Sequence, residues 1–133
     1  MRFIGDRSTL SSQLVSVIDN AEHETKDAAA IVLTIALSYG GRDELLRAIR
    51  GVPSDTLAKL SESKLSSLLD TKDIPDPDLI IRTGGEHRLS NFLPWQSVYS
   101  ELYFLDTLWP EFSKDEFHTA LEWFRSRERR MGA

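Results

Sequence analysis

Two arginines and several neutral hydrogen-bonding residues follow a short apolar run in the second half of the chain. Arg82 and Arg88 flank the glycine pair Gly84-Gly85, and the neutral residues beside them are Thr83, Ser90 and Asn91. A guanidinium group can donate two parallel hydrogen bonds to phosphate oxygens, and glycine lets the backbone pass close to a ligand. Ligands of open α/β sheets bind just past the carboxyl ends of the strands. The cluster therefore predicts a site for a phosphorylated, and more specifically a diphosphorylated, ligand.

The same residues also allow a plainer interpretation. Arg82 and Arg88 can be solvated or ion-paired loop residues, as most charged side chains are. The cluster is not a nucleotide-binding loop of a familiar type, because no Gly-Lys-Ser/Thr follows it and Gly84-Gly85 lacks the dinucleotide spacing. Spacing alone leaves the ligand undetermined.

Glu101 is the carboxylate nearest to this cluster that stands within apolar sequence, in Ser-Glu-Leu-Tyr-Phe. A carboxylate in apolar surroundings is either paired with a cationic side chain or serves a bound cation. Spacing by itself favours a salt bridge to an arginine.

The elements that must position these side chains follow from the hydrophobic pattern. A continuous apolar run such as AAAIVLTIAL, residues 28–37, is typical of a strand that is covered on both faces. Pro75 and Pro77 exclude a helix before the apolar run at residues 79–81. The predicted strands are residues 2–5, 30–37 and 78–82, with a brief one at 102–104.

Apolar residues at helical spacing alternate with these strands. Asp6, Ser8 or Thr9 can cap the first helix, and Ser113 can cap the last. The predicted helices are residues 10–24, 43–50, 114–129 and, within a polar stretch, 53–69. Alternating strands and helices predict an α/β fold with a mainly parallel sheet and flanking helices.

Composition restricts the class of protein. A chain of 133 residues fits a single domain, residues 1–133, and 41% hydrophobic with 28% charged residues is ordinary for a globular protein. A net charge of −5 argues against binding nucleic acid. No cysteine is present, so thiolate metal sites and disulfides are excluded. No apolar run approaches the ~20 residues of a membrane span, and the first residues do not form a signal peptide, so the expected location is cytoplasmic.

Long motifs carry a resemblance to a known family. The segment IRTGGEHRLSNFLPWQSVYSELYF, residues 81–104, and LWPEF, residues 108–112, closely resemble the C-terminal signature of the cis-prenyltransferases, the undecaprenyl diphosphate synthase family. IALSYGGRDEL, residues 35–45, resembles the preceding motif of that family, in which Asn is commoner than Ser38. Pro94 stands where family members often have Leu. The resemblance covers essentially the whole chain.

The resemblance implies a fold and a reaction. Enzymes of this family join isopentenyl diphosphate to an allylic diphosphate such as farnesyl diphosphate, and they lengthen a polyprenyl chain with Z geometry. Carried over by motif, Arg82, Arg88 and Ser90 resemble the residues that bind the isopentenyl diphosphate headgroup, and His87 beside them is a further candidate. Glu101 resembles the carboxylate that is associated with Mg²⁺, which reverses the preference for a purely structural salt bridge.

The resemblance also implies a missing part. No residue matches the DGNxR-type segment that carries the catalytic aspartate of the family, so no catalytic residue is assigned and the fold is expected to lack its N-terminal strands and helices. Two interpretations stay open: a prenyltransferase chain, or a non-catalytic accessory subunit that binds diphosphate. The implied partners are a second copy in a homodimer, or a chain that supplies the missing half. Because the product is a lipid, peripheral contact with the inner membrane face is also implied.

Overall fold

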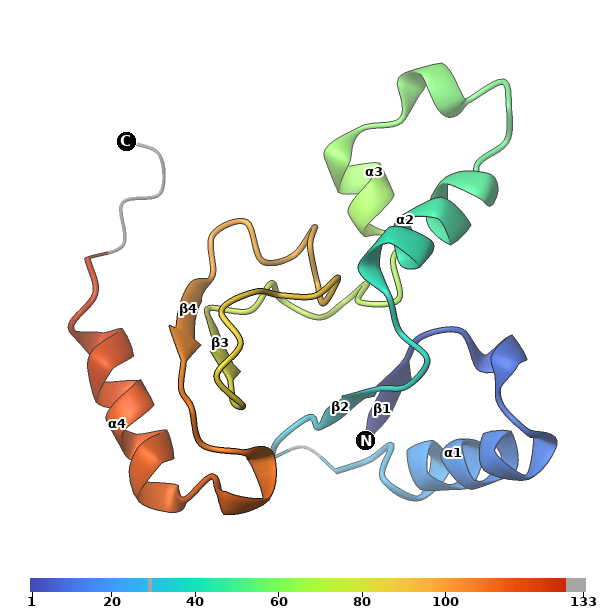
Figure 1. The fold of residues 1–133 in the computed structure, drawn as a ribbon. Helices are drawn as coiled ribbons and strands as arrows, with labels where there is room; N and C mark the ends of the chain where they lie inside the picture. Colours follow the sequence, from blue (N-terminus) through green and yellow to red (C-terminus); the bar gives the residue numbers. More distant parts are fainter. Residues whose placement is uncertain (29, 129–133) are drawn as a thin grey trace. The chain divides into compact units, whose positions relative to one another are not determined.

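The computed structural model describes residues 1–28 and 30–128. These residues form two compact units, unit 1 from Met1 to Ile74 and unit 2 from Pro75 to Ala133, and each is described by itself. Each unit contains one two-stranded parallel sheet with helices beside it (Figure 1). The predicted α/β class with parallel strands is therefore confirmed, while a single domain over residues 1–133 stays a prediction.

Unit 1 is built on the strands β1, Arg2–Ile4, and β2, Thr34–Ala36, which pair in parallel. Between them lie a short 3-10 helix, Arg7–Thr9, and the helix α1, Ser12–Glu24, and after β2 follows the helix α2, Gly41–Arg50. Ile18 of α1, at 2% exposure, is among the most deeply buried side chains of the unit.

The cap of α1 differs from the prediction. Ser11 accepts the hydrogen bond from the backbone N–H of Leu14 at 3.2 Å and so begins the helix. Asp6 instead caps the 3-10 helix, since its side chain accepts from the backbone N–H of Ser8. A separate 3-10 turn therefore lies between β1 and α1, and the predicted start at residue 10 is two residues early.

Gly5 ends β1 in a conformation that only glycine adopts readily. Its φ is +115°, and a Cβ at this position would lie 2.0 Å from the carbonyl oxygen of Leu37. The close approach lets the backbone N–H of Leu37 bond to Ile4 O at 3.0 Å and that of Asp6 bond to Ser38 O at 3.1 Å. The carboxyl ends of β1 and β2 are thereby joined beyond the regular strands.

The predicted strand over residues 30–37 is wrong in its first half. Only Thr34–Ala36 forms a strand, and Ile31 and Val32 before it are 85% and 70% exposed. In the structure β2 pairs with β1 alone, so the apolar run has no second neighbouring strand to cover it. Its composition indicated a covered strand, whereas the described part of the chain contains no element that covers it.

The segment after α2 is less helical than its leucine spacing predicted. It forms a 3-10 helix, Leu57–Lys59, and a short helix α3, Glu62–Ser66, which Ser61 caps by accepting from Lys64 N at 3.1 Å. The prediction of one helix over residues 53–69 is therefore wrong. Leu65 and Leu69 are buried, at 8% and 2% exposure, so the leucine spacing marked the core contacts correctly but not the helix length.

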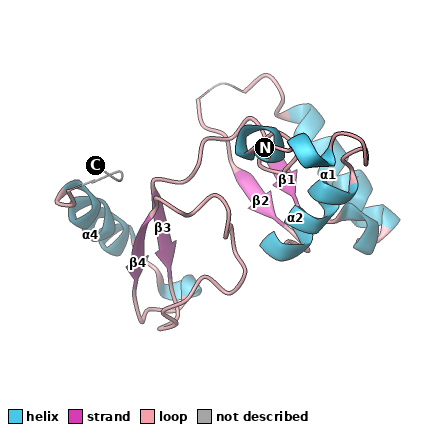
Figure 2. Cartoon of the chain, turned by 90° about the horizontal axis from the view of Figure 1, so that it is seen from above, coloured by secondary structure: helices cyan, strands magenta, loops and turns pink. Residues whose placement is uncertain are grey.

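Unit 2 is built on the strands β3, Leu79–Arg82, and β4, Glu101–Phe104, which pair in parallel with Leu79 opposite Glu101. A long loop connects them, and a 3-10 helix, Trp109–Glu111, follows β4. The helix α4, Lys114–Arg125, closes the unit and lies beside β3 and β4 (Figures 1 and 2).

The start of α4 confirms the predicted cap. Ser113 accepts from the backbone N–H of Glu116 at 3.2 Å, and the Glu116 carboxylate accepts in return from the backbone N–H of Ser113 at 2.8 Å. This reciprocal capping box satisfies two of the backbone donors that every helix start leaves unpaired. The helix ends at Arg125, and the predicted end at residue 129 lies outside the described residues.

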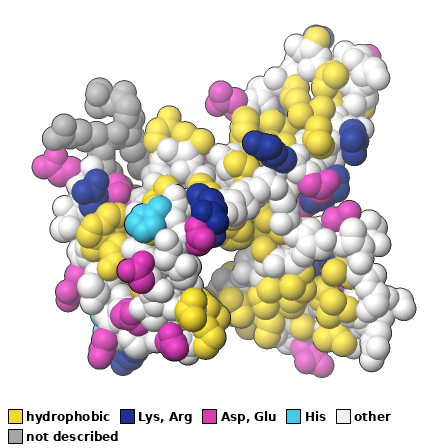
Figure 3. All heavy atoms as spheres, in the orientation of Figure 1, with side chains coloured by type: hydrophobic (Ala, Val, Ile, Leu, Met, Phe, Trp, Pro, Cys, Tyr) yellow, Lys and Arg dark blue, Asp and Glu magenta, His cyan; other side chains and the backbone are white. Residues whose placement is uncertain are grey.

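Large apolar side chains reach the surface of both units. Figure 3 shows hydrophobic side chains gathered over α1 in unit 1 and over α2 and α3. In unit 2, Tyr99 and Trp109 are 72% and 74% exposed. Phe92, in the long loop between β3 and β4, is 41% exposed. Among the described residues no helix is long and apolar enough to cross a membrane.

Candidate functional site

Two of the predicted site residues, Arg82 and Ser90, meet at the end of β3. Arg82 is the last residue of that strand, and its Nη1 donates to the Ser90 hydroxyl at 3.0 Å. The same Nη1 donates to the backbone carbonyl oxygen of Arg88. The loop after β3 therefore folds back onto the guanidinium of Arg82, which brings all three positions together.

The turn that makes this return possible uses unusual backbone conformations. Ser90 and Asn91 have φ values of +46° and +68°, in the left-handed region, which Asn tolerates well but Ser seldom adopts. The loop is held there although both residues carry a Cβ. Strained backbone of this kind clusters at ligand sites, and it is an observation that points toward function.

Arg88 contributes its backbone, not its side chain, to the contact with Arg82. Its guanidinium forms an ion pair with Glu86, and the Arg88 side chain is 63% exposed. An exposed ion pair of this kind contributes little to stability. The two predicted guanidinium groups are thus on one loop, one ordered by hydrogen bonds and the other at the surface.

The glycine pair has a different role from the one that the sequence indicated. The N–H of Gly84 donates to Thr107 O at 2.9 Å, and that of Gly85 donates to Leu105 O at 3.0 Å. Both residues have positive φ, and a Cβ on Gly85 would lie 3.3 Å from Asp106 Oδ1. These amides tie the loop after β3 to the segment after β4, so in this structure they are engaged within the protein.

His87 lies against β4 rather than against the arginines. Its ring stacks on Phe104, the last residue of β4, with centroids 5.0 Å apart and planes 16° apart. Stacking holds the imidazole over the end of β4. In Figure 3, histidine, cationic and acidic side chains lie side by side on the face of unit 2 that is in view.

Glu101 begins β4, and its carboxylate is paired. Arg127 Nε donates to Glu101 Oε2 at 3.1 Å, and the two side chains are 51% and 21% exposed, in that order. The salt bridge to an arginine that spacing alone favoured is present. Glu101 is 19 residues after Arg82 in the sequence and lies on the neighbouring strand. In the parallel register Glu101 is opposite Leu79, and Phe104 is opposite Arg82.

Mg²⁺ is the metal that the resemblance implied, and the donor at Glu101 suits it. A carboxylate oxygen is the hard ligand that Mg²⁺ prefers, and a cationic group already occupies this one. Among the described residues no group of three or more His, Asp or Glu side chains could enclose a metal ion.

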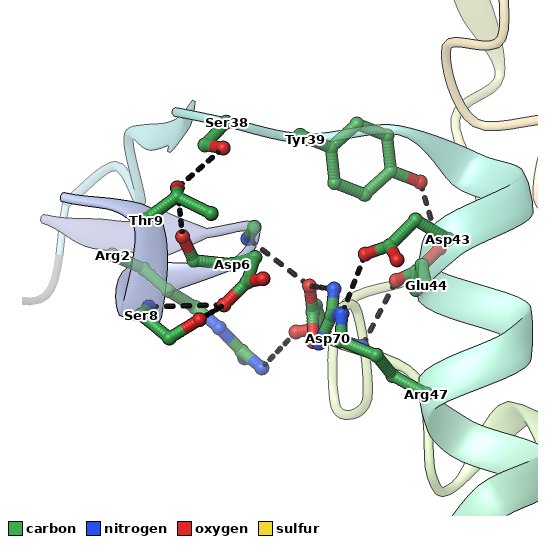
Figure 4. Close-up of polar contacts among 11 residues, drawn as sticks. Arg2, Asp6, Ser8, Thr9, Ser38, Tyr39, Asp43, Glu44, Arg47 and Asp70 are labelled. Atoms are coloured by element: carbon green, nitrogen blue, oxygen red, sulfur yellow. Dashed lines mark hydrogen bonds and ion pairs between the residues drawn. The ribbon is translucent and has the colours of Figure 1, made fainter.

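Unit 1 contains a polar network that the sequence reading did not single out. Asp70 accepts from Arg47 Nη2 at 2.7 Å and Nη1 at 3.0 Å, and from the backbone N–H of Gly5 at 3.0 Å (Figure 4). Glu44, 1% exposed, accepts from Asp70 N at 2.9 Å and from Tyr39 OH at 2.7 Å. The network joins the start of α2 to the ends of β1 and β2.

The network also sets the ionisation of its members. The Arg47 guanidinium, by hydrogen bonding to Asp70, holds the pKa of that carboxyl below its usual range against the opposing effect of burial. The pKa of Arg47 is raised in turn, chiefly by the same hydrogen bond. Both groups are therefore charged at neutral pH, and the pair acts as a fixed joint between α2 and β1.

A cavity of about 320 Å³ lies elsewhere in unit 1, between the end of α2 and α3. Its lining is mainly apolar, from residues such as Val52 and Leu68, with Lys59 and Lys64 among the polar members. None of the predicted site residues lines it. The residues that match the predicted chemistry lie in two separate places: Arg82, Arg88 and Ser90 meet at the carboxyl end of β3, whereas Glu101 lies at the amino end of β4, at the opposite end of the same sheet.

Comparison with known proteins assigns this arrangement to a family. The family model "Putative undecaprenyl diphosphate synthase" matches residues 1–132. The chain belongs to this family. The recognition from the motifs at residues 35–45 and 81–112 is thereby confirmed.

Individual members of the undecaprenyl diphosphate synthase family are similar along almost the whole chain. An isoprenyl transferase from Aquifex aeolicus is 47% identical over 99% of this chain and 57% of its own length. A (2E,6E)-farnesyl-diphosphate specific ditrans,polycis-undecaprenyl-diphosphate synthase from Acinetobacter baylyi is 46% identical over 99% of this chain and 55% of its own. The crystal structure of lavandulyl diphosphate synthase from Lavandula x intermedia, in complex with dimethylallyl diphosphate, has a TM-score of 0.93 at 33% identity and covers 99% of this chain and 59% of that one.

The match confirms the undecaprenyl diphosphate synthase-like fold. The chain spans little more than half the length of the curated relatives that it matches. Ser38 has a φ of +48°, a left-handed conformation that Asn tolerates better than most residues do.

Proposed function

We propose that this chain carries the isopentenyl diphosphate half of a cis-prenyltransferase site, in an enzyme that joins isopentenyl diphosphate to an allylic diphosphate such as farnesyl diphosphate. The observation that carries the proposal is the loop after β3, where Arg82 bonds to Ser90 Oγ and to the Arg88 carbonyl. The product of such an enzyme is a Z-polyprenyl diphosphate of the undecaprenyl type.

The arrangement suits the charge of the ligand. A diphosphate needs several charge-assisted hydrogen bonds, and Arg82, Arg88 and Ser90 offer them from one loop at the end of a parallel strand. Arg82 is already ordered, so little entropy is lost when it binds. His87, stacked on Phe104, stands one residue before Arg88 and adds a donor at the rim.

Glu101 supplies the metal carboxylate in this proposal. When bound, Mg²⁺ neutralises negative charge on diphosphate oxygens and so favours departure of the allylic diphosphate. Glu101 is the residue of this chain that would hold the ion, and substrate phosphate oxygens and water would supply its other ligands. No residue of this chain is assigned as the catalytic acid or base.

A binding titration tests the headgroup site directly. Isopentenyl diphosphate should bind the chain more tightly than isopentenyl monophosphate, as measured by calorimetry with and without Mg²⁺. Arg82→Ala should remove the preference for the diphosphate, whereas Arg50→Ala, on the exposed surface of α2, should keep it. Equal binding of the two ligands by a folded chain contradicts the proposal.

A second candidate is an accessory role without turnover by this chain alone. The observation that favours it is the coverage: the chain matches little more than half the length of these relatives. The chain alone should then yield no polyprenyl product from radiolabelled isopentenyl diphosphate, farnesyl diphosphate and Mg²⁺. Co-expression with the remaining part of a relative should restore product. Product from the pure chain alone contradicts this candidate.

Assembly and location follow from the same proposal. The exposed aromatic residues of unit 2, Tyr99 and Trp109, are suited to an interface, either in a homodimer or with a chain that supplies the remainder. We place the protein in the cytoplasm, with peripheral contact at the inner membrane face, because its product is a lipid. Vesicle flotation in the presence of product checks this contact.

A further inference from the structure

The cavity between the end of α2 and α3 has no part in the proposed function. Its volume of about 320 Å³ falls at the lower end of the range of about 300–1,000 Å³ that is typical of small-molecule sites. All its lining residues belong to the segment 51–68, so the cavity is formed within unit 1 alone. Apolar side chains make up half of the lining: Val52, Pro53, Leu60 and Leu68.

Polar groups along this wall are bonded within the protein. The backbone N–H of Val52 donates to Ile49 O at 3.0 Å. The hydroxyl of Thr56, the neutral polar side chain of the lining, donates to Pro53 O at 2.9 Å. An occupant therefore meets apolar surface over most of the wall, and its binding is favoured by the removal of its own apolar surface from water.

The α3 side of the cavity is anchored to the core of unit 1. Leu65 of α3 and Leu69 after it are 8% and 2% exposed, and Leu68, which lines the cavity, stands between them in the sequence. Small-molecule sites are usually largely formed before the ligand binds, and an anchored wall meets this condition.

Two lysines supply the charge of the lining, and no acidic residue belongs to it. Lys59 ends the 3-10 helix Leu57–Lys59, and Lys64 lies in α3. In the part of the chain that the structure describes, neither ammonium group has an ion-pair partner. In Figure 3 cationic side chains lie beside hydrophobic ones over α2 and α3. The chain carries a net charge of −5, so a cationic lining departs from the average of the molecule and favours an occupant with an anionic end.

We propose that this cavity binds an amphiphilic anion: a single aliphatic chain fills the apolar part, and a carboxylate or phosphate headgroup contacts the ammonium groups of Lys59 and Lys64. The chain contributes through burial, and the headgroup contributes charge-assisted hydrogen bonds. A neutral chain of the same length lacks the second contribution, and inorganic phosphate lacks the first. None of the residues assigned to diphosphate binding lines the cavity, so the inference does not rest on the proposed function.

The first test compares ligands that differ in one feature. The isotope-labelled 133-residue chain is titrated with decanoate, decyl phosphate, decanol and inorganic phosphate, each below its micelle concentration, and the amide signals are followed by NMR. Decanoate and decyl phosphate should shift the amides of Val52, Leu60 and Leu68 at lower concentration than decanol or inorganic phosphate does. Intermolecular NOEs from the decanoate chain to the methyl groups of Val52 and Leu68 should place it in the cavity.

Lys59→Gln and Lys64→Gln test the headgroup contact. Both residues are exposed, so the substitutions remove charge without disturbing the core. Each should weaken decanoate binding about two- to fivefold, the range that an exposed charge pair supports. The double variant should bind decanoate no better than decanol. Lys26→Gln, which removes a charge from another exposed position of unit 1, is the matched control and should bind decanoate like the parent.

Vesicles distinguish the two sources of such a ligand, a free amphiphile and one chain of an anionic membrane lipid. Flotation is compared for phosphatidylglycerol and phosphatidylcholine vesicles. Binding to phosphatidylglycerol alone, retained in Lys26→Gln and lost in the double variant, supports a membrane lipid as the ligand. Binding of decanoate without binding to either vesicle supports a free amphiphile.

Several results would overturn the inference. They are equal affinity of the parent for decanoate and decanol, decanoate binding that the double variant leaves unchanged, and binding of neither amphiphile nor vesicle. NOEs to Ile31 and Val32 in place of the cavity residues also overturn it, because decanoate would then bind the exposed apolar run before β2. Failure of the diphosphate site leaves these results unaffected, since the two sites share no residue.

Discussion

Arg82 Nη1 lies 3.0 Å from Ser90 Oγ, and this bond closes the loop after β3 on the end of its own strand. Arg82→Ala should cost on the order of 1.5–3 kcal/mol of diphosphate binding, the range for hydrogen bonds to charged groups. Arg82→Lys should recover part of this, since it restores charge but not the planar fork. Calorimetric titration with isopentenyl diphosphate measures both, and wild-type affinity in a folded Arg82→Ala variant would remove Arg82 from the site.

Glu101→Gln separates the metal from the phosphate contacts. The amide is nearly isosteric with the carboxylate and lacks its charge, so Mg²⁺-dependent diphosphate binding should weaken. Binding without metal should stay the same or become slightly tighter, because one carboxylate no longer repels the anion. Titrations in Mg²⁺ and in a chelator give the comparison. An equal loss in both conditions would indicate damage to the fold, which circular dichroism detects.

Gly5 and Gly51 form a matched pair for testing the joint between β1 and β2. Gly5→Ala places a Cβ 2.0 Å from Leu37 O at a φ of +115°, whereas Gly51 has a φ of −77° and its Cβ would meet Ala48 O at 3.4 Å. Gly5→Ala should lose at least about 1–3 kcal/mol of stability through backbone strain. Gly51→Ala should be neutral or gain about 0.4–1 kcal/mol. Urea unfolding measures both, and similar midpoints would show that the close approach at Gly5 relaxes without cost.

Acid should weaken unit 1 through Asp70. Because Arg47 and Gly5 N–H hold the pKa of Asp70 below its unfolded value of about 3.9, its stabilising contribution is fully present above that value. The contribution is lost as the pH falls through the lower folded pKa. Asp70→Asn should therefore be less stable than the parent at pH 7 and differ less from it at pH 2–3. Urea unfolding across this range, with Asp55→Asn in an exposed turn as control, tests the sign.

The exposed apolar run before β2 should make the isolated chain associate. Ile31 and Val32 are 85% and 70% exposed, and adjacent large apolar side chains usually mark an interface or an aggregation site. Replacing both by Lys should reduce light scattering and the binding of dyes to apolar surface. Leu57→Lys, at another exposed apolar position of 45%, is the control for added charge. A parent chain that stays monomeric and binds no dye contradicts the prediction.

Local rules in the sequence determined much of unit 2. Proline before an apolar run set the start of β3, and Ser113 with Glu116 set the start of α4, because a capping box depends on residues only three positions apart. The family was likewise readable from uninterrupted motifs, and the family model confirms it. The roles of Arg82, Arg88, Ser90, His87 and Glu101 in binding stay predictions.

Contacts between distant residues were decided only by the tertiary structure. Nothing near Asp70 in the sequence indicates that its carboxylate accepts from Gly5 N and Arg47, 65 and 23 residues away. From the sequence, Glu101 could pair with a cationic side chain or serve a bound cation. The structure shows that it pairs with Arg127, 26 residues later in the sequence, because the segment after α4 returns to the start of β4. The strand over residues 30–37 failed for the same reason. An apolar run indicates that a segment can be buried, but its strand pairing depends on which neighbours the fold places beside it. Here β1 pairs only with Thr34–Ala36.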